Sequence, residues 1–169
     1  MTIEKMISEK DIQIRVKELS DEINKYYNNG DLYVICVLKG AVMFTCDLVK
    51  NLTMPVTLDF LIASSYGNET FSSEHVDIIK DIDVDIANKK VLVIDDIKDT
   101  GYTLNKLIEH LSLKSPKEIK TCTLFSKRGK SITKADFVGF ELGDEFIIGY
   151  GLDYKQKYRN LPYVGKLVK

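Results

Sequence analysis

Tryptophan is absent from the 169 residues, and cysteine and histidine are scarce, with three and two copies. Cys36, Cys46 and Cys122 are odd in number, contain no C-x-x-C pair and all fall in apolar segments. We therefore expect reduced thiols in the core and no disulfide framework. We expect His75 in a polar loop and His110 in an amphipathic helix, which argues against a histidine-based triad or a histidine-rich metal site. Acid–base chemistry is then expected from carboxylates.

Long hydrophobic runs and an excess of one charge are also missing. The longest apolar runs, such as residues 32–38, are far shorter than the roughly 20 residues of a membrane span. The beginning of the sequence is charged rather than signal-like. The net charge of −1 gives no overall reason to bind nucleic acid or an anionic membrane. We therefore expect a cytoplasmic protein with no nucleic-acid or membrane partner.

The usual nucleotide-binding loops are absent as well. No G-x-x-x-x-G-K-[ST] sequence occurs, and the G-x-G at 149–151 has Tyr154 where a third glycine is needed. Instead, helical and extended patterns alternate without a linker, repeat or low-complexity tract. With 44% hydrophobic residues, this length predicts one domain over residues 1–169. The alternation predicts an α/β fold with a mostly parallel central sheet flanked by helices.

Hydrophobic spacing predicts the individual elements. Ser8 and Asp11 resemble a capping box, and apolar residues at helical spacing follow them. Residues 64–74 are rich in turn formers and fit either a mobile lid or a solvated hairpin connection, and Gly143-Asp144 predicts a hairpin turn. Helices are expected over about 12–26, 42–49 and 104–111, and strands over 32–38, 56–63, 76–79, 84–86, 91–94, 119–125, 137–140 and 146–150.

The stretch from Lys90 to Leu104 concentrates the candidate chemistry. A buried strand ends in Asp95 and Asp96, and a short polar loop then opens a helix, which makes the helix N-terminus an anion site. Glycine and threonine in the loop allow close backbone approach and supply hydroxyl donors for a phosphate. The acids can accept hydrogen bonds from sugar hydroxyls or from hydrated Mg²⁺. The stretch therefore predicts a site for a phosphorylated sugar.

Two other interpretations apply to this stretch. Individual acids or threonines could be helix caps or solvated residues, although this explains the whole set poorly. The strand with its acidic pair is also similar to the first strand of a receiver signalling domain. That interpretation fails because too few residues follow Asp96 for the remaining strand and helix repeats.

Residues 91–104 resemble the phosphoribosyl-diphosphate (PRPP) motif of the type I phosphoribosyltransferases. Three further segments extend the likeness to the hypoxanthine-guanine branch: 37–40 (VLKG), 63–67 (ASSYG) and 144–159 (DEFIIGYGLDYKQKYR). The match runs from about residue 37 to 168, and the first thirty residues match loosely. The resemblance implies a type I phosphoribosyltransferase fold, with a small hood of short strands formed largely by residues 127–169 and a lid at 64–75.

The same resemblance implies an activity and roles for single residues. The protein would transfer the phosphoribosyl group from PRPP to hypoxanthine or guanine in purine salvage (EC 2.4.2.8). The products would be IMP or GMP and pyrophosphate, the reaction would use Mg²⁺, and the protein would form a homodimer or homotetramer. Ribose and 5′-phosphate would contact Asp95, Asp96, Lys98, Asp99, Thr100, Gly101, Tyr102 and Thr103. Pyrophosphate would contact Lys39, Gly40 and Arg159. The purine would contact Lys127, Phe146, Ile147 and Asp153. The lid would include Ser65 and Tyr66.

Three of these implied roles are chemically specific. Asp99 would be the general acid or base, exchanging a proton with purine N7 across an oxocarbenium-like transition state. Asp153 would bind Mg²⁺, with Asp95 and Asp96 as further ligands, directly or through water. Lys127 can only donate, so it suits a 6-oxo group and should reject adenine. In this family the peptide bond before the residue matching Lys39 is often cis.

Ordinary structural roles compete with some of these assignments. Phe146 could be a core aromatic, residues 127–128 a solvated turn, and Asp153 with Arg159 a surface ion pair. A PRPP-binding regulator with the same fold would also keep the phosphate loop but lack base transfer. The sequence does not decide between hypoxanthine and guanine, or whether xanthine is accepted.

Two residues depart from the family pattern. Asp95 occupies a position where glutamate is usual, which retracts the carboxylate by one methylene group. Lys98 replaces a usually apolar residue, and we expect it near the anion site, paired with one of the acids.

Overall fold

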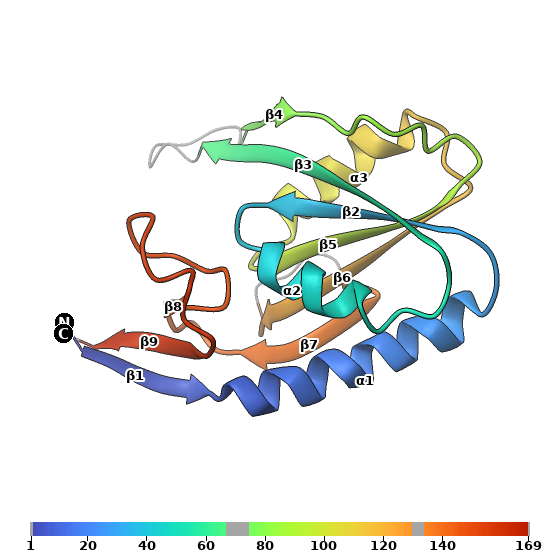
Figure 1. The fold of residues 1–169 in the computed structure, drawn as a ribbon. Coiled ribbons are helices and arrows are strands. Elements are labelled where there is room, and N and C mark those ends of the chain that lie inside the picture. Colours follow the sequence, from blue (N-terminus) through green and yellow to red (C-terminus); the bar gives the residue numbers. More distant parts are fainter. Residues whose placement is uncertain (1, 67–74, 130–133, 169) are drawn as a thin grey trace.

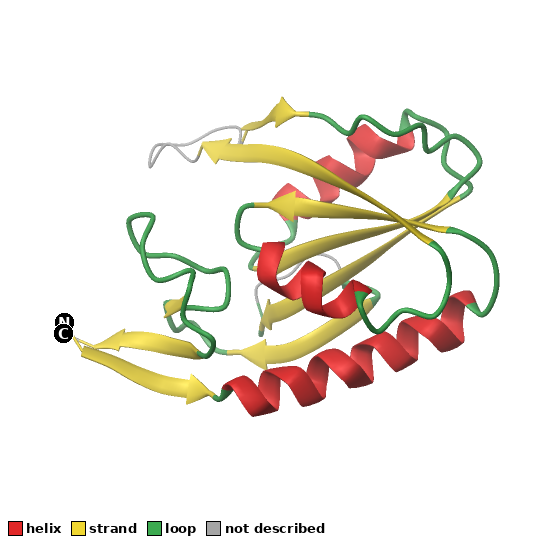
Figure 2. Cartoon of the chain, in the orientation of Figure 1, coloured by secondary structure: helices red, strands yellow, loops and turns green. Residues whose placement is uncertain are grey.

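The computed structural model describes residues 2–66, 75–129 and 134–168. Helices and strands alternate along most of the chain, as Figures 1 and 2 show. The elements are β1 (Thr2–Ile7), α1 (Glu9–Tyr27), β2 (Leu32–Leu38), α2 (Val42–Val49), β3 (Val56–Tyr66), β4 (His75–Lys80), β5 (Lys90–Lys98), α3 (Tyr102–Ser112), β6 (Glu118–Lys127), β7 (Phe137–Leu142), β8 (Ile147–Ile148) and β9 (Val164–Val168).

A six-stranded sheet with the order β4-β3-β2-β5-β6-β7 forms the centre of the fold. The strands from β3 to β7 in this order run parallel, and β4 is antiparallel at the edge. Helices α1 and α2 cover one face of the sheet and α3 covers the other (Figure 1). The predicted α/β fold with a mostly parallel sheet is confirmed.

The helices form where the sequence pattern predicts them. Ser8 caps α1, because its hydroxyl accepts a hydrogen bond from the Asp11 N–H at 3.1 Å. The apolar stripe of α1 is buried against the sheet and α2. In α3, Leu104, Leu107 and Leu111 are buried against the opposite face, which fixes the direction of this helix as it leaves β5.

A second, three-stranded sheet with the order β1-β9-β8 forms the hood. It brings the two ends of the chain together, since Thr2 pairs with Val168 (Figure 1). The hood thus includes an N-terminal strand that the sequence interpretation missed. The predicted hairpin at Gly143-Asp144 is wrong, because β7 pairs with β6 in the central sheet while β8 pairs with β9 in the hood.

Two further expectations need correction, and a third is not tested. Strand β3 extends to Tyr66 and pairs antiparallel with β4, so His75 lies in a strand and not in a loop. Residues 84–86 form no strand; buried Ile86 packs in the α3-side core from a loop. Residues 67–74 of the predicted lid lie outside the described residues.

The cysteines are all free, as expected, but they do not all lie in the core. Cys36 and Cys122 are buried in the sheet, whereas Cys46 is exposed on α2. The expectation for Cys46 is wrong because that position lies on the outer side of the helix. No helix in the described part of the chain is long and apolar enough to span a membrane.

Candidate active site

Three adjoining pockets open where the parallel strands end at their carboxyl sides. The smallest, about 80 Å³, lies at the loop between β5 and α3. The second, about 280 Å³, is bounded by Lys127 and by the segment that contains Phe146 and Ile147. The third, about 660 Å³, is bounded by the β2–α2 turn and Arg159. We refer to them as the loop pocket, the hood pocket and the turn pocket.

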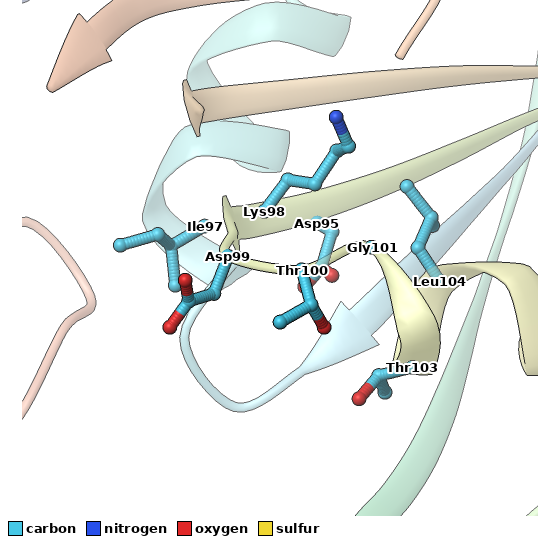
Figure 3. Close-up of a pocket in the computed structure, with 8 residues that line it drawn as sticks. All are labelled: Asp95, Ile97, Lys98, Asp99, Thr100, Gly101, Thr103 and Leu104. Atoms are coloured by element: carbon cyan, nitrogen blue, oxygen red, sulfur yellow. The ribbon is translucent and has the colours of Figure 1, made fainter. Parts of the chain in front are cut away.

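The loop pocket is formed by the predicted phosphate loop (Figure 3). It is lined by Asp95, Ile97, Lys98, Asp99, Thr100, Gly101, Thr103 and Leu104. Gly101 has φ 84°, a left-handed conformation in which a glycine avoids the steric cost of a side chain. The Thr100 hydroxyl accepts a hydrogen bond from the Tyr102 N–H at 3.2 Å, so the loop turns directly into α3. The first backbone N–H groups of α3 and its dipole therefore favour an anion here.

Asp95, which is buried, and Asp96, which is half-buried, form an interacting acid pair. The Asp96 N–H donates to Asp95 Oδ1 at 3.0 Å, and the Ile97 N–H donates to Asp96 Oδ1 at 2.7 Å. Burial raises the pKa of Asp95 well above its ordinary value, and the neighbouring charge of Asp96 raises it further. Burial also raises the pKa of Asp96. Two full negative charges side by side are therefore unfavourable at this site without polar or positively charged partners.

Lys98 is a buried amine in the same pocket. Its residue is only 3% exposed, and burial lowers its pKa. Within residues 2–66, 75–129 and 134–168, Lys98 makes no ion pair, so the expected pairing with an acid is wrong. In Figure 3 its side chain leaves the strand on the side opposite to the Thr100 and Thr103 hydroxyls. Lys98 thus lines the loop pocket without closing over the hydroxyl groups.

The turn pocket joins β2 to the acid pair. The peptide bond between Leu38 and Lys39 is cis, as the resemblance implied. A Cβ atom on Gly40 would overlap the Asp96 carboxylate, so any other residue here would require this side chain to move. Lys39 and Gly40 line this pocket together with Asp96 and Arg159. These predicted pyrophosphate residues therefore face one space.

The hood pocket brings together residues predicted to bind a purine. Lys127 Nζ lies 3.3 Å from Asp99 Oδ2, and the Lys127 side chain is 17% exposed. Phe146 is 59% exposed and meets Tyr154 edge to face, with 5.9 Å between ring centroids, so it is not a core aromatic. Ile147 in β8 and Asp153 complete this part of the pocket. Lys127 is accordingly not a freely solvated turn residue.

Asp153 lies between the hood pocket and the turn pocket and lines both. Its Oδ1 pairs with Arg159 Nη2 at 2.8 Å, and its Oδ2 accepts the Gln156 N–H at 2.8 Å. Arg159 Nη1 also donates to the Gly151 carbonyl oxygen at 2.7 Å. These contacts hold the arginine at the pocket wall, so the pair is more than a surface contact.

The acids of this region offer part of a site for a divalent metal. The described residues contain no group of three or more histidine, cysteine or acidic side chains arranged to hold a metal. Mg²⁺ commonly binds through one or two carboxylates together with phosphate oxygens and water. Asp96 and Asp153 both line the turn pocket, so the residues fit this mode of binding.

The structure also reveals site residues that the sequence interpretation missed. Ile97 lines all three pockets and lies at their junction. In the sequence Ile97 is a single apolar residue between Asp96 and Lys98, which gave no separate signal of a site. Glu145 and Leu152 line the hood pocket, and Gln156 lines the turn pocket. Ser65 and Tyr66, predicted for the lid, follow the pocket residue Ser64 in β3.

Comparison with known proteins identifies the class. The family model for the phosphoribosyl transferase domain matches residues 5–155, so the chain belongs to this family. It is 46% identical to the hypoxanthine phosphoribosyltransferase of Buchnera aphidicola, covering 99% of this chain and 97% of that protein. It is 48% identical to the hypoxanthine-guanine phosphoribosyltransferase of Bacillus subtilis, covering 96% and 91%. Within the family, the chain therefore groups with these 6-oxopurine enzymes.

A solved structure supports the same grouping. The crystal structure of a hypoxanthine-guanine phosphoribosyltransferase from Bacillus anthracis, with a HEPES molecule in its active site, superposes with a TM-score of 0.93. The two chains are 44% identical, and the alignment covers 98% of each. The type I phosphoribosyltransferase fold predicted from the resemblance is confirmed.

Proposed function

We propose that the protein transfers the 5-phosphoribosyl group of PRPP to hypoxanthine or guanine, giving IMP or GMP and pyrophosphate in purine salvage. One observation carries this proposal beyond family membership: three pockets meet at Ile97. PRPP and a base together present a 5′-phosphate, a pyrophosphate and a purine around one ribose. The helix N-terminus suits the 5′-phosphate. The pocket wall with lysine and arginine suits the pyrophosphate, and the wall with an aromatic ring suits the purine.

PRPP would lie across the loop pocket and the turn pocket. The loop from Asp99 to Thr103 would bind the 5′-phosphate, and Asp95 and Asp96 would accept hydrogen bonds from the ribose hydroxyls. Lys39, Gly40 and Arg159 would face the pyrophosphate. Lys98 would add positive charge near the loop, behind the hydroxyl groups.

The purine would occupy the hood pocket. Lys127 would donate to the 6-oxo group, Phe146 would stack on the ring, and the Ile147 carbonyl would accept from a ring or 2-amino N–H. Because an ammonium group cannot accept a hydrogen bond, the 6-amino group of adenine would leave Lys127 unpaired. The pocket thus favours 6-oxopurines.

Asp99 would exchange a proton with purine N7 while the bond between ribose and pyrophosphate breaks and the new bond to the base forms. The ribose carbon becomes electron-poor in such a transition state, and Arg159 would offset the negative charge that grows on pyrophosphate. Mg²⁺, held through Asp153 and the substrate oxygens, would supply further neutralisation of that charge. Asp95 and Asp96 would fix the ribose in place.

Further parts of the proposal follow the resemblance. Residues 64–75 would act as a lid that excludes water, and residues 127–169 would form most of the base-binding hood. We also propose a cytoplasmic protein in the form of a homodimer or homotetramer.

A coupled product assay tests this function. Incubation with PRPP, Mg²⁺ and hypoxanthine should release pyrophosphate and IMP in equal amounts, and omission of any component should stop both. Tight binding of PRPP without any pyrophosphate release from hypoxanthine or guanine would instead indicate a PRPP-binding regulator with the same fold.

A further inference from the structure

The hood pocket has an unusual balance of charge. Four carboxylate residues and one amine line it: Asp96, Asp99, Glu145, Asp153 and Lys127. The amine already pairs with Asp99 at 3.3 Å. No second basic residue lines this pocket in the described part of the chain. A base that presents a second carbonyl group therefore meets no second cation.

Glu145 differs from the other acids of this pocket. Asp99 pairs with Lys127, Asp153 pairs with Arg159, and Asp96 accepts a backbone N–H at 2.7 Å. Among the residues that the structure describes, Glu145 has no ion pair or hydrogen bond. Its carboxylate lies beside the preceding turn, where a Cβ atom on Gly143 would come within 2.8 Å of Glu145 Oε2. Glu145 is thus the carboxylate of this pocket whose oxygens can accept hydrogen bonds from a ligand without breaking a contact within the described protein.

The position of Glu145 in the chain links it to the base. It directly precedes Phe146 and Ile147, the residues proposed to stack on the purine and to accept an N–H from its ring or its 2-amino group. Lys127, on β6, is proposed to take the 6-oxo group. The hood segment would then contact the base at the substituent on C2, where Glu145 adds a second acceptor to the Ile147 carbonyl.

We propose that Glu145 selects the purine by its substituent at C2, favouring guanine and disfavouring xanthine; this rests on the proposed function. Guanine carries an amino group there, which donates to a carboxylate. Xanthine carries a carbonyl oxygen, which cannot donate and is repelled by a second acceptor. An acceptor that loses water without gaining a donor costs free energy, so the discrimination is against xanthine as well as for guanine.

Replacing Glu145 tests the assignment. In Glu145→Gln the amide can donate to the 2-oxo group, so kcat/KM for xanthine relative to guanine should rise about tenfold. Glu141→Gln is the matched control, because Glu141 lies on β7, pairs with Arg128 at 3.1 Å and does not line the pocket. The control should leave the ratio unchanged. An unaltered xanthine-to-guanine ratio in Glu145→Gln would overturn the proposal.

A binding measurement separates this inference from the proposed function. The affinities of GMP and XMP, measured by calorimetry on the same variants, need no turnover. The GMP-to-XMP affinity ratio should fall about tenfold in Glu145→Gln and remain constant in the control. If the affinity ratio does not change while hypoxanthine transfer is normal, only the role of Glu145 is contradicted. If no 6-oxopurine is a substrate, the proposed function is contradicted.

Discussion

Lys127 Nζ and Asp99 Oδ2 lie 3.3 Å apart at the wall of the hood pocket. The two side chains come from the ends of neighbouring parallel strands, β6 and the loop after β5. The 6-oxo group and N7 lie on the same edge of a purine, so a bound base would meet both side chains at once. The ion pair thus holds the proposed oxo-binding group and the proposed proton-transfer group next to each other before the base binds.

The first prediction concerns Asp99. Asp99→Asn should lower kcat with hypoxanthine by roughly 10² or more, because an amide cannot take or return a proton, while PRPP affinity changes little. Steady-state rates together with calorimetric PRPP binding measure both effects. Asp21→Asn, on exposed α1 surface, should match the unaltered protein. Near-normal turnover of Asp99→Asn would remove this carboxylate from the mechanism.

The second prediction concerns the stability cost of Lys98. Lys98→Met should increase the free energy of unfolding by about 1 to 3 kcal/mol, since it removes a buried amine without a counter-charge and keeps its volume. Urea unfolding at pH 7 measures the change. Lys106→Met, on the exposed side of α3 where the lysine pairs with Glu109 at 2.7 Å, should give no gain. A loss of stability in Lys98→Met would show that the amine is well compensated in the folded protein.

Gly40 gives the third prediction. Gly40→Ala should lower the free energy of unfolding by roughly 1 to 3 kcal/mol, because the new Cβ overlaps the Asp96 carboxylate. It should also weaken PRPP binding, since the turn and the acid line the same pocket. In an Asp96→Ala background the same change should cost much less, which a double-mutant cycle measures. Equal costs in the two backgrounds would mean that the overlap is relieved in another way.

The fourth prediction uses the pH dependence of stability at Asp59. Burial alone would raise the pKa of this carboxyl, but hydrogen bonds from the backbone N–H groups of Phe60, Val84 and Asp83 outweigh burial and hold the pKa below its ordinary value. A lowered pKa stabilises the folded state above the pKa of the unfolded chain. That stabilisation is lost as pH falls through the lower, folded-state pKa.

Asp59→Asn should therefore reduce the free energy of unfolding by roughly 1 to 3 kcal/mol at pH 7, and the difference should shrink as pH falls below about 4. Denaturant unfolding at a series of pH values measures it. Asp31→Asn, at an exposed position, should show no such trend. A constant deficit at every pH would attribute the effect to shape and not to charge.

The central sheet and its helices could be predicted because their signals are local. The apolar runs of β2 and β5 and the spacing of leucines in α3 are complete within a few residues of sequence. The hood could not be predicted in the same way. Strand β1 depends on pairing with β9 at the other end of the chain, and β7 pairs with β6 although a turn-like Gly143-Asp144 follows it.

The site shows the same division. Acids, glycine and threonines of one contiguous motif predicted the loop pocket. Lys98 kept its predicted place there but not its predicted ion pair, since burial is set by how strand and helix pack around it. Glu145 and Ile97 carried no separate signal, because their role at a pocket wall arises only when the hood segment and the strand ends come together.

Initial rates with four bases test the central claim most directly. With saturating PRPP and Mg²⁺, hypoxanthine and guanine should yield IMP and GMP, each with an equal amount of pyrophosphate. The initial rate with adenine should be lower by a factor of about 10³ or more, because Lys127 cannot accept a hydrogen bond. The initial rate with xanthine should be lower than the initial rate with guanine. Adenine as the fastest substrate, or no pyrophosphate from any 6-oxopurine, would contradict the account.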